Sequence, residues 1–200
     1  MKYLSYAAVF TLILGMASCA TTPKVTRTDI GQVIDLSGNW NDTDAQMVSK
    51  DMIADVTTRP WIDDFLVKKQ NKPRVIVGTV VNKSQEHINT GTFINDLQRE
   101  LTNSGRVMFV ASRSERDEIR DEKVDQAMNA AVETAKSAGQ ETGADFMLKG
   151  EINTILDEAG NTQVRYYQVN LELVNILTNE KVWIGEKKIK KEIKRPGSKI

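Results

Sequence analysis

The sequence predicts an α/β (α+β) domain: a mixed sheet of about five strands with packed helices, ending in an antiparallel meander. Two patterns indicate this fold. Helix-type and strand-type segments alternate between residues 43 and 137, which is typical of crossover connections between strands. Three strand-type segments then follow one another between residues 144 and 193, separated only by short turns, as in antiparallel hairpins. A composition of 40% hydrophobic and 27% charged residues fits a globular chain of this kind.

The chain begins with the pattern of an export signal. Lys2 precedes an apolar run over residues 3–16, which is too short to span a bilayer. The segment Met16-Ala17-Ser18-Cys19 follows, and it resembles the lipobox of bacterial lipoproteins, whose usual first residue is Leu. The resemblance implies a signal peptide over residues 1–18 and lipid attachment at Cys19, where several acyl chains would hold the protein stably on a bilayer. A free thiol in an ordinary signal peptide or in a short anchor is the alternative.

Residues 19–41 are predicted to be the lipidated cysteine and a short tether, and residues 42–200 a single globular domain. About 22 tether residues would span roughly 25 Å as a relaxed coil. Ala20 and Thr21 follow the cysteine, so no Asp stands where the enterobacterial sorting rule would favour the inner membrane. We therefore expect an outer-membrane lipid anchor facing the periplasm, with inner-membrane anchoring as the alternative.

Two helices are predicted at the start of the domain. A capping-box pattern at Thr43–Gln46 opens the first, and Pro60, which is tolerated at a first helical position, opens the second. Apolar residues at helical spacing mark their core-facing sides: Ala45, Val48, Met52 and Val56 in the first, and Trp61, Ile62, Phe65 and Leu66 in the second.

Two further helices are predicted between the early strands and the meander. Thr92 is the expected cap of the first, which places Phe93, Ile94, Leu97 and Leu101 on one side and stops at Gly105. A capping-box pattern at Ser112–Glu115 opens the second, which is expected to run to about Ser137.

Two apolar segments between these helices predict strands. Residues 75–81 (VIVGTVV) are apolar on both faces, which is typical of a central strand covered on both sides. Residues 107–110 (VMFV) predict a short buried strand. In the meander, by contrast, Tyr167, Val169, Leu171 and Leu173 alternate with polar residues, which predicts a half-exposed strand.

Two aromatic side chains are candidate partner contacts, because Trp and Tyr are enriched at binding hot spots. Trp61 is the first, although its helical spacing suits a place in the core better. Tyr166 is the second, since its neighbour Tyr167 belongs to the apolar face of the strand and the two must point in opposite directions. On that opposite face Tyr166 would either meet a partner or lie under a helix.

The sequence offers no motif for catalysis or cofactor binding. It has no G-x-S-x-G, P-loop or G-x-G-x-x-G pattern, and it lacks the S-x-x-K and K-T-G segments of wall-modifying transpeptidases. His87 is the only histidine and stands in a polar loop without flanking ligands. We expect no enzyme activity, no cofactor and no metal. Lys plus Arg equals Asp plus Glu at 27 each, so charge gives no reason to expect a nucleic acid partner.

The basic C-terminal run KKIKKEIKRPGSK, residues 187–199, has two interpretations. It could contact an anionic partner, such as a cell-wall polymer. It could instead be an edge strand whose lysines prevent sheet-to-sheet association, which is the interpretation that we favour.

Several segments together resemble the LpoB-type penicillin-binding-protein activator lipoproteins. They are RVIVGTVVNKSQEHINT, LQRELTNSGRVMFV, ETGADFMLKGEI and YYQVNLELVNILTNEKVWIGEKKIKK, together with the lipobox. The resemblance covers most of residues 43–193 and implies a fold like the N-terminal domain of TolB. It also implies a function: a lipoprotein that binds a bifunctional penicillin-binding protein, a peptidoglycan synthase, and stimulates cell-wall synthesis. No local motif carries the family's interface residues, so none is transferred.

Other functions remain as alternatives. Curli-secretion-type lipoproteins share a related core, but they need an additional membrane-inserting hairpin of about ten residues per strand, for which this chain has no spare amphipathic segments. A wall hydrolase would need a pair of carboxylates in an apolar cleft, and nothing in the sequence places one. We therefore expect a monomeric protein that acts by binding, with a penicillin-binding protein as its partner and peptidoglycan as a second candidate contact.

Overall fold

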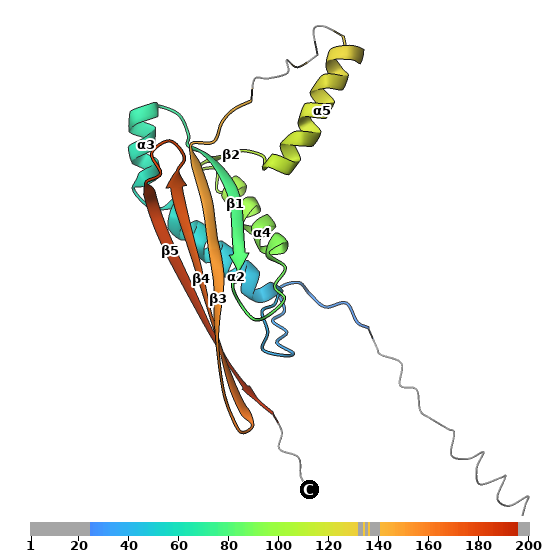
Figure 1. Ribbon diagram of the computed structural model, residues 1–200, viewed down its shortest axis with the longest axis vertical. Helices are drawn as coiled ribbons and strands as arrows, with labels where there is room; N and C mark the ends of the chain where they lie inside the picture. The colour runs from blue at the N-terminus through green and yellow to red at the C-terminus, as the bar shows by residue number, and fades with distance from the viewer. Residues whose placement is uncertain (1–24, 132–133, 135, 137–140, 196–200) are drawn as a thin grey trace, which may run out of the picture. The chain divides into compact units, whose positions relative to one another are not determined.

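The computed structural model describes residues 25–131, 134, 136 and 141–195 (Figure 1). The signal peptide expected at residues 1–18 and the lipidation site expected at Cys19 lie outside this range. The chain divides into two compact units, residues 1–32 and residues 33–200. Every helix and strand that is described belongs to the second unit.

The order of helices and strands in this unit is the one predicted. The elements are α2 (Asp42–Thr57), α3 (Trp61–Lys69), β1 (Arg74–Asn82), α4 (Thr90–Asn103), β2 (Met108–Phe109), α5 (Arg113–Asn129), β3 (Phe146–Ala159), β4 (Thr162–Asn175) and β5 (Lys181–Lys194).

In the described part of the chain, five strands form one sheet in the order β2-β1-β3-β4-β5. Strand β1 pairs in parallel with β2 and β3, whereas β3, β4 and β5 form an antiparallel meander. Figure 1 shows the three long meander strands side by side, with their far hairpin extending beyond the helices. The predicted mixed sheet with a C-terminal meander is therefore confirmed.

The hydrophobic core lies between one face of this sheet and helices α2, α3 and α4. The apolar stripes expected on these helices form the helical side of the core, and Val48, Ile62, Phe93 and Leu97 are completely buried. The sheet side comes from alternate residues of β3 and β4, as period-2 side-chain alternation requires. Helix α5 contributes no described side chain to the core.

Polar contacts also fasten β5 to α2. The indole Nε1 of Trp183 donates a hydrogen bond to Asp55 Oδ2 at 2.8 Å, and Lys187 pairs with Asp51 at 2.6 Å. Gly185 makes the first contact possible, because a Cβ at this position would overlap the Trp183 ring. The edge strand is thus held to a helix from the opposite end of the domain sequence.

Three helix boundaries differ from the prediction. Helix α2 is capped by Asn41 rather than by Thr43: the Asn41 side chain accepts from the Asp44 backbone amide, and the Asn41 backbone amide donates to the Asp44 carboxylate. Helix α4 is capped by Asn89 rather than Thr92. In both cases an earlier Asn has the extended backbone that a cap requires and accepts from a first-turn amide. The capping box at Ser112 and Glu115 is confirmed.

Helix α5 ends at Asn129, before the predicted end near Ser137, and the backbone of Ala130 is extended. Residue 137 itself lies outside the described range. The helix buries no described side chain, and Met128 is 72% exposed. Since most helical stability in proteins comes from packing an apolar face, little sustains further turns here.

The prediction that β1 is covered on both sides is wrong for its second half, where Thr79 and Val81 are exposed. The expected burial of β2 is also only partly met, because Met108 is 50% exposed. Both strands lie toward one edge of the sheet, and the core helices cover only one of its faces. Apolar composition alone does not distinguish such strands from fully covered ones.

Candidate functional site

The face of the sheet that points away from α2, α3 and α4 is the candidate site, here called the open face. It consists of the alternate side chains of β1, β3, β4 and β5 that do not enter the core. Its members include Val81, Met147, Lys149, Glu151, Ile155, Tyr166, Asn170, Glu172, Ile184 and Lys190.

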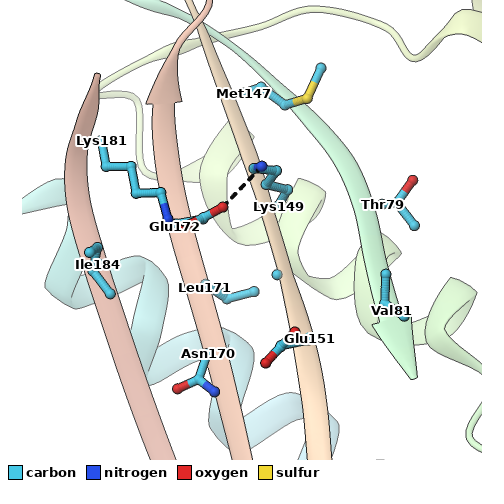
Figure 2. Close-up of a pocket in the computed structure, with 11 residues that line it drawn as sticks. Thr79, Val81, Met147, Lys149, Glu151, Asn170, Leu171, Glu172, Lys181 and Ile184 are labelled. Carbon is cyan, nitrogen blue, oxygen red and sulfur yellow. Dashed lines mark ion pairs between the residues drawn. The ribbon is translucent and has the colours of Figure 1, made fainter. Parts of the chain in front are cut away.

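The open face has a hollow of about 570 Å³ at the end of the sheet where β5 begins. Figure 2 shows Ile184 on β5, Met147 on β3 and Val81 on β1 around it, with charged side chains between them. Ile184 is 67% exposed and Val81 is 45% exposed. The hollow therefore presents apolar walls to solvent.

A cluster of three charges crosses the hollow. The carboxylate of Glu172 on β4 pairs with Lys149 Nζ on β3 at 3.0 Å and with Lys181 at the start of β5 (Figure 2). The Glu172 side chain is only 21% exposed, whereas those of Lys149 and Lys181 are 46% and 52% exposed. The hydrogen bond from Lys181 lowers the pKa of Glu172, and Lys149 adds to this against the raising effect of burial. Two ammonium groups thus share one ionised carboxylate.

Strand register explains how these side chains meet. Lys149, Glu172 and Ile184 are directly opposite one another on three neighbouring strands, so they share one face at one level of the sheet. On the β1 side, the register shifts between Val77 and Val80. Gly78 lies in this irregularity, and a Cβ there would come within 3.0 Å of the Met147 sulfur. Gly78 therefore leaves room for the Met147 side chain, which lines the hollow.

The structure separates the two aromatic candidates. Tyr166 lies on the open face, between Ile155 of β3 and Lys190 of β5, and none of the three core helices covers it. Trp61 is 7% exposed, donates from Nε1 to the carbonyl of Val56 at 2.7 Å and packs edge-on against Phe146. Trp61 therefore belongs to the core, and only Tyr166 is placed where it can meet a partner.

A second polar cluster, for which the sequence carries no signal, surrounds Glu86 in the loop after β1. Its Oε1 accepts from Arg165 Nη1 and from the hydroxyl of Tyr167, both at 2.6 Å, and its Oε2 accepts from the backbone amide of Trp40 at 3.1 Å. Burial acts to raise the pKa of Glu86, but the hydrogen bonds from Tyr167, Arg165 and Trp40 outweigh it and hold the pKa below its ordinary value.

This cluster fixes the segment Val33–Asn41, here called the strap, to the domain. The Tyr167 hydroxyl lies 3.2 Å from the carbonyl oxygen of Gly38, and the Trp40 ring packs edge-on against Phe93 and Tyr167. The strap falls within the predicted tether of residues 19–41. Its last residues nevertheless make contacts with β4 and α4.

The basic run on β5 is largely paired within the domain. Lys191 contacts Asp35 of the strap at 2.8 Å and Asp44 of α2 at 2.6 Å, and its side chain is 12% exposed. Burial acts to lower the pKa of Lys191, whereas these two carboxylates raise it above its ordinary value. Because β5 is also the last strand of the sheet, its lysines fit the guarded-edge interpretation.

No feature of the described residues suggests a metal centre or a membrane span. Within the described ranges, no three His, Cys, Asp or Glu side chains are grouped so that they could hold a metal ion. Among the helices described, none is long and apolar enough to cross a membrane. His87 is exposed.

A family profile described as the peptidoglycan-synthase activator LpoB matches residues 44–189, from the first turn of α2 into β5. The chain belongs to the LpoB family. The resemblance inferred from the sequence is therefore confirmed, and the hollow of the open face lies within the matched residues. No curated protein sequence matches the chain.

Solved structures of LpoB proteins are similar to this chain at low identity. The C-terminal domain of LpoB from Escherichia coli is 14% identical over 73% of this chain and 98% of its own, with a TM-score of 0.43. The corresponding domain from Salmonella enterica is 16% identical over 65% and 93%, with a TM-score of 0.34. An NMR structure of E. coli LpoB is 14% identical over 90% and 87%, with a TM-score of 0.37.

Proposed function

We propose that this protein is a lipid-anchored periplasmic lipoprotein that binds a bifunctional penicillin-binding protein and activates its peptidoglycan synthesis. The observation that carries the proposal is the family match, which spans nearly the whole folded domain. The sequence supports it, since no motif for catalysis is present and a binding protein needs none. The exposed, partly apolar open face supplies a surface through which binding could occur.

Activation through binding alone has a simple physical requirement. The protein must bind the active conformation of the synthase more tightly than the inactive one, because a ligand shifts an equilibrium only by its differential affinity. A difference of about 3 kcal/mol would change the ratio of active to inactive synthase by roughly 150-fold. A rigid sheet face can provide such a difference without any chemical step.

The test is a reconstituted assay with the purified full chain in detergent and the bifunctional penicillin-binding protein of the same organism. We expect saturable binding and a severalfold faster consumption of lipid-linked glycan precursor when the chain is added. Adding the same concentration of heat-unfolded chain serves as the control. An unchanged polymerisation rate at saturating concentrations of the folded chain would contradict the proposal.

Lipid attachment at Cys19 is tested separately. In the wild type, we expect an intact mass that corresponds to a chain beginning at Cys19 and carrying acyl groups, in membranes that sediment at outer-membrane density. In Cys19→Ser the thiol needed for the thioether is absent, so the mass should be that of the unprocessed 200-residue chain. A wild-type mass without acyl groups would exclude the anchor, and sedimentation with the inner membrane would correct the expected leaflet.

A further inference from the structure

We infer that the hollow on the open face binds a segment of the partner synthase that presents an apolar side chain flanked by carboxylates. The inference rests on the proposed function and adds to it the place of contact and the chemistry of the bound segment. Three properties of the hollow support the inference: its apolar walls, its excess of positive charge and the greater exposure of its lysines.

The apolar walls can receive an apolar side chain together with parts of its neighbours. Exposed hydrophobic residues that stand alone are ordinary at protein surfaces. Val81, Met147 and Ile184, however, come from three different strands and line one hollow of about 570 Å³, which is within the size range of ligand pockets. Met147 adds adaptability, since a flexible thioether can repack around different partners.

The charge of the hollow favours an acidic segment. Lys149 and Lys181 carry two positive charges against the negative charge of Glu172. Glu151 also lines the hollow, but its carboxylate is paired with Lys83 of the loop that follows β1. These five groups together leave an excess of one positive charge. The two lysines are more than twice as exposed as the carboxylate between them, so an approaching segment meets ammonium groups first. A partner carboxylate can therefore pair with either lysine, whereas a basic segment would be repelled.

The same charge disfavours a second copy of this chain as the bound molecule. A two-fold dimer that used this hollow would place it against its own symmetry mate, because isologous interfaces pair identical patches. The lysines of each copy could then pair only with Glu151 and Glu172 of the other copy, and these carboxylates are already engaged by lysines of their own chain. A different protein that supplies additional carboxylates is the better match.

The experiment measures the Kd between the purified full chain and the bifunctional penicillin-binding protein. One variant is Ile184→Asp, which places a charge in the apolar wall, and the other is Lys149→Ala with Lys181→Ala, which removes both ammonium groups. The controls make the same changes on α3, at positions that are also exposed: Val67→Asp, and Lys68→Ala with Lys69→Ala. Thermal melts verify that all four variants remain folded.

We expect the two hollow variants to weaken binding by about tenfold or more, as for residues near the centre of an interface, and the two controls to stay within about twofold. Raising the salt concentration from about 50 to 300 mM should weaken wild-type binding more than that of the double lysine variant, because screening acts on the charges removed there.

The outcomes distinguish a contact elsewhere on the domain from a failure of the proposed function. If the wild type binds and activates the synthase and the hollow variants do so equally well, the contact lies elsewhere and only this inference is overturned. If Ile184→Asp instead converts a wild-type dimer to a monomer without affecting synthase binding, the hollow binds a second copy. If the folded wild type does not bind any bifunctional penicillin-binding protein of its organism, the proposed function fails and this inference fails with it.

Discussion

Gly150→Val is expected to lower the free energy of unfolding by about 3 kcal/mol, at the upper end of the range for overpacked sites. Gly150 lies in the central strand β3, between Val80 of β1 and Leu171 of β4. A Cβ at this position would overlap the carbonyl oxygen of Asn170 and lie 2.6 Å from Leu171 Cδ2. Relief would require β3 and β4 to separate, because part of the obstruction is backbone.

Thermal unfolding followed by circular dichroism measures this effect. A loss of about 3 kcal/mol corresponds to a decrease in Tm of roughly 6–12 °C for a domain of this size. Gly143→Val is the matched control, since its Cβ would have no heavy atom within 4 Å outside its chain neighbours. Equal melting temperatures for the two variants would show that the close approach of β3 and β4 at Gly150 is not a constraint.

Glu86→Gln is expected to destabilise the protein by about 2 kcal/mol at pH 7, because it leaves the guanidinium of Arg165 without its carboxylate partner in a partly buried place. It should also change how stability depends on pH. The pKa of Glu86 is lower in the folded protein than its ordinary value of 4.5, so the contribution of Glu86 to stability is fully present above that value. It is lost as the pH falls through the folded-state pKa.

Urea unfolding between pH 7 and pH 3 tests both statements. The wild type should lose stability more steeply than Glu86→Gln over the acid part of this range, since the variant has no carboxylate to protonate at that position. Asp157→Asn, which neutralises an exposed carboxylate on β3, provides the control and should retain the wild-type pH profile. Parallel profiles for wild type and Glu86→Gln would contradict the role assigned to the cluster.

Local pattern was enough to predict the order of the elements and most of the core. The stripe Ala45, Val48, Met52 and Val56 in α2 is buried as expected, and so is the alternating set on β4 that begins at Tyr167. These predictions succeed because they depend on periodicity within one element. The boundaries were less accurate, because the choice between Asn41 and Thr43 as a cap depends on where the preceding chain turns.

The features of the candidate site depend instead on residues far apart in the sequence. Glu86 and Arg165 are separated by 79 positions, and nothing near either one indicates a pair. Likewise, the hollow exists only because Lys149, Glu172 and Ile184 come into register on three strands. The sequence predicts that Tyr166 lies on the face opposite Tyr167. Only the packing of the whole domain shows that no core helix covers Tyr166.

The strap has a mechanical consequence if Cys19 carries the proposed anchor. A pull between membrane and domain would act first on the ion pair of Asp35 with Lys191 and then on the contacts of Gly38 and Trp40, before it separated any strands. Peeling the nine residues of the strap away would lengthen the connection by up to about 30 Å while leaving the sheet intact. The domain could then accommodate a wider envelope by releasing the strap, while its helices and strands remain folded.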